Sequence, residues 1–209
     1  MPDNTDLLIE KLVASHRAVS PFAAESILRL SVLLLGLCAL LLLLPLGVRA
    51  DWGVVALLKT TALLALTTAL LKFTLLVSGP AQPSWPNVWG FLLILLLSLG
   101  LFAGFAVKGA ALSFQEATAV SSFWACVTWV SLIGVGAVLF LHRMLRRAKP
   151  GQRQLLRLAI PLCAALLAAT VYSLHCPVDA LAYLLTAYLL ATAIIVGFGW
   201  LLSRRLWCW

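Results

Sequence analysis

Two cysteines, Cys126 and Cys176, are the residues of this chain whose type and placement best suit chemistry. They lie on different hydrophobic segments, in Ser-Ser-Phe-Trp-Ala-Cys and in Leu-His-Cys-Pro, where His175 precedes Cys176. Paired thiols on an oxidising face of a membrane can form a disulfide, and thiolates beside an imidazole can bind zinc or another soft metal. Asp179 is a candidate fourth ligand. The alternative is that both cysteines are small packing residues.

Long apolar runs determine the fold class. The chain has 63% hydrophobic residues and a mean hydropathy of +1.07, and about twenty apolar residues cross a bilayer as one helix. We predict an all-α membrane protein, a bundle of six transmembrane helices preceded by a short cytoplasmic helix. The first run is too long for a cleavable signal peptide and should stay in the mature protein. The predicted spans are 26–48, 53–77, 88–107, 123–145, 154–174 and 180–202. The predicted domains are a cytoplasmic N-terminal segment (1–25), the transmembrane bundle (26–203) and a cytoplasmic C-terminal tail (204–209).

The distribution of Lys and Arg predicts the orientation of the bundle. These residues favour the cytoplasm in short connections between spans. Only Arg49 and Lys108 lie near the span ends of the other side, so we expect both termini in the cytoplasm and residues 175–179 outside. Twelve cations lie on the expected cytoplasmic side, and Lys72 near the inner end of the span 53–77 is counted with them. They are Lys11, Arg17, Arg29, Lys72, Arg143, Arg146, Arg147, Lys149, Arg153, Arg157, Arg204 and Arg205.

This orientation brings the two cysteines to similar depth. Cys126 lies about one turn, or roughly 5.4 Å, inside the outer end of its span, and Cys176 directly follows its own span. The connection between these spans is short, so they should be neighbours. A disulfide would then require a Cα separation of about 4.4–6.8 Å.

Other residues with chemical potential have simpler interpretations. Lys59 lies well inside a span, but only about 9 Å from its outer boundary at helical rise, so its long stem can reach the interface. We interpret it as structural. Cys38 and Cys163 lie in mid-span and Cys208 near the C-terminal end, and we assign them no role. The net charge of +8 gathers at span ends, which indicates topology and lipid contact and excludes nucleic acid as a direct partner.

The N-terminal segment carries an amphipathic pattern. Asn4 or Thr5 can cap a helix whose first turn holds Asp6. So short a helix is marginal alone in water and needs a membrane interface or a groove on a partner. Its acidic residues disfavour an anionic leaflet, which favours a protein partner. The apolar stripe consists of Leu8, Ile9, Leu12 and Val13.

Three motifs give the chain a family resemblance. They are Thr-Asp-Leu-Leu-Ile-Glu-Lys-Leu (5–12), Ser-Ser-Phe-Trp-Ala-Cys (121–126) and Tyr-Ser-Leu-His-Cys-Pro (172–177). In these motifs and their order the chain resembles the NrsF-type six-span membrane anti-sigma factors, which restrain bacterial extracytoplasmic-function sigma factors. That family usually has an acid directly after the proline, whereas this chain has Val178 there and its acid at Asp179.

The resemblance implies a regulator of transcription in the stress response, and not an enzyme. The tail would sequester a sigma factor at the bacterial inner membrane, and Cys126 and Cys176 would help to release it under metal or oxidative stress. Two alternatives stay open. A quinone-linked thiol oxidoreductase usually has Cys-x-x-Cys spacing, which is absent here, and a small transporter needs more polar groups within the spans. A bound quinone or uptake by proteoliposomes would favour one or the other.

Overall fold

The computed structural model describes residue 37 and residues 47–78, 85–108, 113–145 and 153–206. Within these ranges the chain is all-helical, with no strand, which confirms the predicted class. The first predicted span, apart from Leu37 and its last two residues, lies outside the described residues. The N-terminal helix also lies outside them, and with it Asp6, Leu8, Ile9, Leu12 and Val13.

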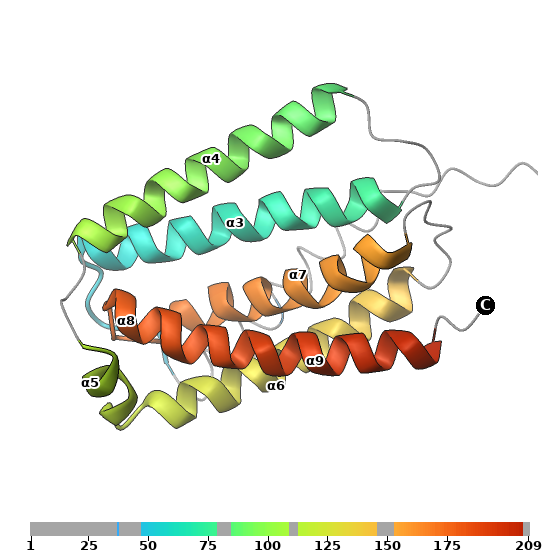
Figure 1. The fold of residues 1–209 in the computed structure, drawn as a ribbon. Coiled ribbons are helices and arrows are strands. Elements are labelled where there is room, and N and C mark those ends of the chain that lie inside the picture. The colour runs from blue at the N-terminus through green and yellow to red at the C-terminus, as the bar shows by residue number, and fades with distance from the viewer. Residues whose placement is uncertain (1–36, 38–46, 79–84, 109–112, 146–152, 207–209) are drawn as a thin grey trace, which may run out of the picture.

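Five described helices are long and apolar enough to cross a membrane, and they correspond to the predicted spans two to six. The last of them contains a π-helical turn, η1, between α8 and α9 (Figure 1). The elements are α3 (Val54–Ser78), α4 (Trp85–Lys108), α5 (Phe114–Ala119), α6 (Phe123–Leu145), α7 (Arg153–Ser173), α8 (Leu181–Tyr183), η1 (Leu184–Tyr188) and α9 (Leu189–Leu206).

Helix α7 forms the centre of the described bundle. It packs against α3, α6 and α9, whereas α4 packs mainly on α3. In the most hydrophobic stretch of α7, 72% of the residues are buried, whereas in that of α4 only 11% are. The buried face of α7 is rich in alanine, and small side chains let neighbouring helices approach closely. At one such approach, a Cβ added to Gly199 of α9 would lie 2.6 Å from the Cβ of Pro161. The buried small residues of α7 are Ala159, Cys163, Ala164, Ala165, Ala168 and Ala169.

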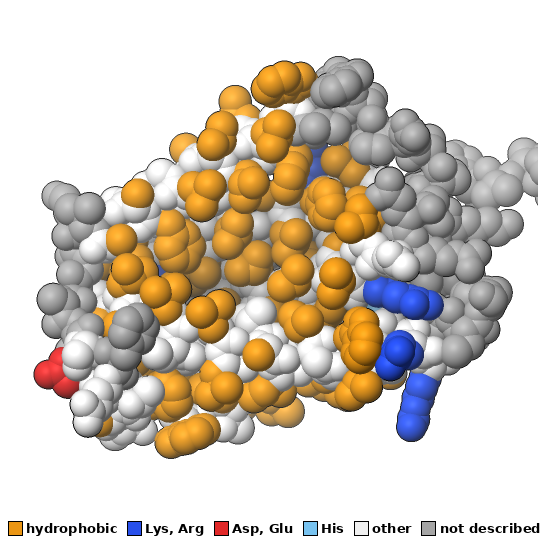
Figure 2. All heavy atoms as spheres, viewed as in Figure 1, with side chains coloured by type: hydrophobic (Ala, Val, Ile, Leu, Met, Phe, Trp, Pro, Cys, Tyr) orange, Lys and Arg blue, Asp and Glu red, His pale blue; other side chains and the backbone are white. Residues whose placement is uncertain are grey.

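The surface suits a bilayer along the length of the bundle. Apolar side chains cover the face shown in Figure 2, and basic side chains gather at the end where α9 finishes. Leu93, Leu96 and Trp124 are among the large apolar residues that are more than two-thirds exposed. Such a surface is unusual for a soluble monomer. It supports helices that can cross a membrane, while their orientation stays a prediction.

The structure adds a short helix, α5, that the hydropathy pattern does not predict. Ser113 caps it, because its Oγ accepts a hydrogen bond from the Glu116 N–H at 3.2 Å. The Glu116 carboxylate in turn accepts one from the Ser113 N–H at 2.8 Å. This reciprocal pair is a capping box. The connection before α6 is therefore partly helical, and the Ser-x-x-Glu spacing was its only signal in the sequence.

Candidate functional site

The two cysteines meet at the end of the bundle where α6 begins and α7 ends. Cys126 lies in the first turn of α6, where its N–H donates to the Ser122 carbonyl at 2.9 Å. Cys176 lies just beyond α7, and its N–H donates to the Tyr172 carbonyl at 3.0 Å. Both are free thiols, 0% and 1% exposed, and they are hydrogen-bonded to each other.

The local sequence explains why the chain turns at Cys176. Pro177 has no N–H to donate to a helical carbonyl, and it disfavours helical geometry for the residue before it. Helix α7 therefore ends at Ser173, and the next three residues donate back to carbonyls of its last turn. The loop that follows, residues 174–180, leads to α8 at Leu181. Cys176 thus has a loop backbone, whereas Cys126 has a helical one.

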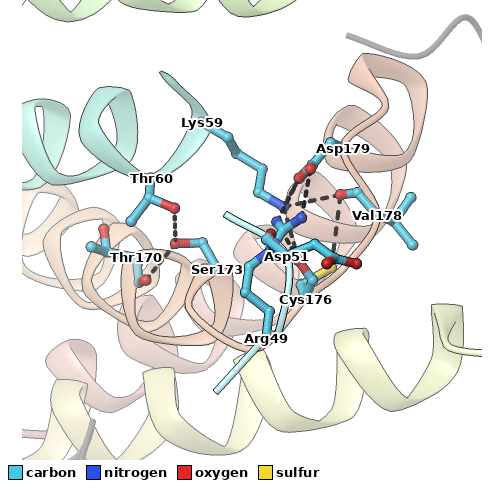
Figure 3. A network of polar contacts seen from close by, with 9 residues as sticks. All are labelled: Arg49, Asp51, Lys59, Thr60, Thr170, Ser173, Cys176, Val178 and Asp179. Carbon is cyan, nitrogen blue, oxygen red and sulfur yellow. Dashed lines mark hydrogen bonds and ion pairs between the residues drawn. The ribbon is translucent and has the colours of Figure 1, made fainter. Parts of the chain in front are cut away.

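A network of charged groups holds this loop (Figure 3). Arg49 donates to both carboxylate oxygens of Asp179, at 2.9 and 2.8 Å. The Lys59 ammonium lies 2.6 Å from the same carboxylate and donates to the carbonyls of Cys176 at 3.1 Å and Val178 at 3.0 Å. Arg49 also donates to the Cys176 carbonyl, at 3.1 Å. Two cations therefore hold one carboxylate and two backbone carbonyls.

The Lys59 side chain does not reach the interface, contrary to the expectation from the sequence. Its side chain is 0% exposed and points from α3 into the protein, toward the 174–180 loop. Asp179 supplies the counter-charge, since a buried ammonium needs an ion pair or several acceptors. The expected reach of the side chain to the interface was wrong, because hydropathy along one helix cannot show an acidic partner from another segment. Lys59 belongs to the candidate site.

The predicted metal ligands do not assemble around the thiols. The Nδ1 of His175 lies 2.9 Å from the Gly47 carbonyl, so the ring is tied to the segment before α3. Asp179 is already bound by Arg49 and Lys59. Among the residues that the structure describes, no group of three or more His, Cys, Asp and Glu side chains could hold a metal ion. The thiol pair alone is brought together.

Electrostatics favour charge on two groups of the loop. The pKa of the Cys176 thiol is lowered, because the Cys126 thiol donates to its sulfur and Lys59 lies nearby, and these effects outweigh burial. Burial acts to raise the pKa of Asp179, but the hydrogen bonds from Arg49 and Lys59 lower it by more. The net result is a pKa below the usual value of an aspartate. Thiolates are the reactive form of cysteine. If the pair loses a proton, these contacts favour the negative charge on the Cys176 sulfur.

All three tyrosines of the chain surround the thiols. The Tyr183 hydroxyl donates to the Ser122 carbonyl at 3.2 Å and also hydrogen-bonds with Cys126. Residues five apart differ in direction by about 140° in an α-helix at 3.6 residues per turn. The π-helical turn, with its i→i+5 bonds, reduces this difference and lets Tyr183 and Tyr188 face the same side. The third tyrosine, Tyr172, lies in the last turn of α7.

Sequence reasoning missed Arg49 and Lys59 as parts of the site. Arg49 was considered only as a charge at a span end. One signal was available: Lys59 within a span, Arg49 after the preceding span and Asp179 beside Cys176 were all expected near the same membrane face. Opposite charges at equal depth would have suggested an ion pair.

Comparisons with known proteins agree with the motifs. No curated protein and no solved structure gives a significant match. A family model described as negative regulator of sigma F, NrsF, matches residues 12–209, almost the whole chain. This match confirms the resemblance and covers both cysteines and the charged network. The chain belongs to the NrsF family, the negative regulators of sigma F.

Proposed function

We propose that this protein is a membrane-embedded anti-sigma factor with a thiol-based sensor. It holds an extracytoplasmic-function sigma factor at the bacterial inner membrane and alters its hold when Cys126 and Cys176 react. The observation that carries the sensing role is the contact between these two buried thiols, which come from different segments of the chain. Membership in a family of negative regulators supports the sigma-factor partner.

The proposed sigma-binding element is the N-terminal segment, residues 1–25. A helix over residues 5–16 would dock the stripe that contains Leu8 and Leu12 into a groove of the sigma factor. Burial of two leucines contributes roughly 3–6 kcal/mol before ordering costs. Docking there would block the sigma surface that binds core polymerase, so inhibition requires no chemistry.

The proposed signal is oxidation of the thiol pair. With hydrogen peroxide as oxidant, the two sulfurs lose two electrons and the thiols lose two protons as an S–S bond forms, and the hydrogen peroxide is reduced to two waters. Cys176 suits the role of first nucleophile because its thiolate is favoured. Both thiols are buried, so the loop must open before an oxidant enters. To change the bound sigma factor from 99% to 1%, oxidation must change the free energy of sigma-factor binding by about 5.5 kcal/mol between the thiol and disulfide states.

Capture of zinc or another soft metal is the second form that the signal could take. It would have to recruit ligands beyond the two thiols, and His175 and Asp179 would have to leave Gly47, Arg49 and Lys59. Structural zinc sites almost always have four ligands. The present contacts therefore favour oxidation over zinc binding.

Co-purification tests the sigma-binding role. Full-length protein extracted in mild detergent should retain a sigma factor, and protein that lacks residues 1–20 should lose it. Leu8→Asp with Leu12→Asp should give the same loss while membrane insertion stays normal. Lys11→Gln, on the polar side of the predicted helix, serves as the control. Equal retention by the truncated protein would remove the N-terminal segment from the proposal.

A further inference from the structure

Two cations converge on the backbone of Cys176, one of the two paired thiol residues. Arg49 Nη1 and Lys59 Nζ each donate to the Cys176 carbonyl, both at 3.1 Å. Arg49 precedes α3 and Lys59 lies within it, whereas Cys176 follows α7. Figure 3 shows both side chains directed at the loop. A displacement of Cys176 would therefore move an atom that both cations contact.

Further contacts join the segment 47–49 to the same loop. The Arg49 N–H donates to the Leu174 carbonyl at 3.2 Å, and His175 is hydrogen-bonded to the Gly47 carbonyl. The Arg49 side chain is 6% exposed and forms a two-point ion pair with Asp179. Backbone and side-chain contacts thus fix residues 47–49 on residues 174–179. The order of residues 47–49 therefore depends on the position of this loop.

We propose that Arg49 and Lys59 are positioning residues that transmit the state of the thiol pair, through the Cys176 carbonyl, to the segment before α3. This inference rests on the proposed function for its biological meaning, because the proposed sigma-binding segment, residues 1–25, precedes residues 47–49 in the chain. The route differs from direct transmission along α6 and α7. It passes through charge-assisted hydrogen bonds that a substitution of Arg49 or Lys59 can interrupt while both cysteines are kept.

Disulfide formation supplies the displacement. The S–S bond is about 2.05 Å long with a dihedral near 90°, so two hydrogen-bonded sulfurs must approach and reorient. Cys126 is held in a helix, whereas Cys176 is part of a loop. The loop residue therefore moves more. Its carbonyl then shifts relative to Arg49 and Lys59, and the contacts that hold residues 47–49 weaken.

Amide hydrogen exchange of the purified full-length protein in lipid nanodiscs tests this route. The probe is diamide, an azo compound that accepts two electrons and two protons as the thiols form a disulfide, and mass spectrometry verifies the bond. In the parent protein, oxidation should speed exchange of residues 47–53 by about tenfold. Residues 113–119 lie at the same end without a described contact to the network, and their exchange should stay constant.

Variants separate transmission from simple destabilisation. Arg49→Gln should show fast exchange at residues 47–53 before oxidation and no further response. Arg49→Lys keeps the charge but loses the two-point pair, and it should respond partially. Lys59→Met should weaken the response, whereas Lys72→Met, which removes a cation from the same helix, should respond like the parent. Cys176→Ser should not respond to diamide.

Two results would overturn the inference. One is a disulfide that forms in the parent without faster exchange at residues 47–53. The other is an Arg49→Lys or Lys59→Met protein that responds as fully as the parent. The measurement contains no sigma factor, so its outcome is independent of whether the N-terminal segment binds one.

Discussion

Substitution of Asp179 by asparagine tests how much the ion-pair network stabilises the protein. Asparagine keeps the size of the side chain and removes its charge. Lys59 would then keep a buried ammonium whose partners are all uncharged: the carbonyls of Cys176 and Val178 and the new amide oxygen. Arg49 would lose its two-point contact with a carboxylate. Both cations would remain largely buried without their counter-charge.

The expected loss follows from burial and from the remaining contacts. Removal of one partner of a buried ion pair costs about 3–5 kcal/mol. The Asp179 side chain is 19% exposed, and Lys59 keeps two carbonyl acceptors, so we expect the lower end, about 3 kcal/mol. A protein of this size loses about 2–4 °C in its unfolding midpoint per kcal/mol. Asp179→Asn should therefore lower the midpoint by about 6–12 °C.

Thermal unfolding in one detergent, followed by maleimide labelling of the buried thiols, measures this shift. Asp51→Asn is the matched control, because Asp51 is an exposed carboxylate two residues from Arg49. That control should unfold within about 2 °C of the parent, as surface substitutions usually do. Equal shifts for the two variants, or a shift of less than about 2 °C for Asp179→Asn, would refute the claim that Asp179 neutralises buried cations.

Three more predictions concern acid stability, the thiol and helix packing. Because the pKa of Asp179 is lowered in the folded protein, its contribution to stability is complete above the unfolded pKa near 3.9 and is lost as the pH falls through the folded pKa. Acid unfolding should show this loss in the parent and not in Asp179→Asn. The lowered pKa of Cys176 predicts that the ultraviolet absorbance of a thiolate appears below the usual titration at about pH 8.5, and Cys176→Ser should abolish this early step. Gly199→Ala should lower stability by about 1–3 kcal/mol through its clash with Pro161, whereas Gly197→Ala, with nothing within 4 Å, should not.

The helical spans were predictable because their signal is local. Each is a continuous apolar run of membrane-spanning length, and the described helices match the predicted runs to within a few residues. The approach of Cys126 and Cys176 was also expected, since charge asymmetry and short connections place the two residues at one depth. Those arguments required no knowledge of side-chain packing.

The partners of the charged groups were not predictable in the same way. Lys59 lies 2.6 Å from Asp179 only because α3 packs beside α7, and no periodicity within α3 records that neighbour. The position of His175 next to a cysteine predicts a metal ligand, but the turn before Pro177 leaves its ring on the Gly47 carbonyl. The π-helical turn at Leu184–Tyr188 was likewise not predicted.

Retention of the sigma factor by the membrane protein before and after oxidation tests the central claim most directly. Immobilised full-length protein in nanodiscs is loaded with its sigma factor, treated with diamide or buffer, and the bound fraction is measured. We expect diamide to change this fraction for the parent. Cys126→Ser, Cys176→Ser and the double variant should bind the sigma factor normally and show no change with diamide. An equal change in the double serine variant, or an unchanged fraction in a parent whose disulfide has formed, would contradict a thiol pair that controls the sigma factor.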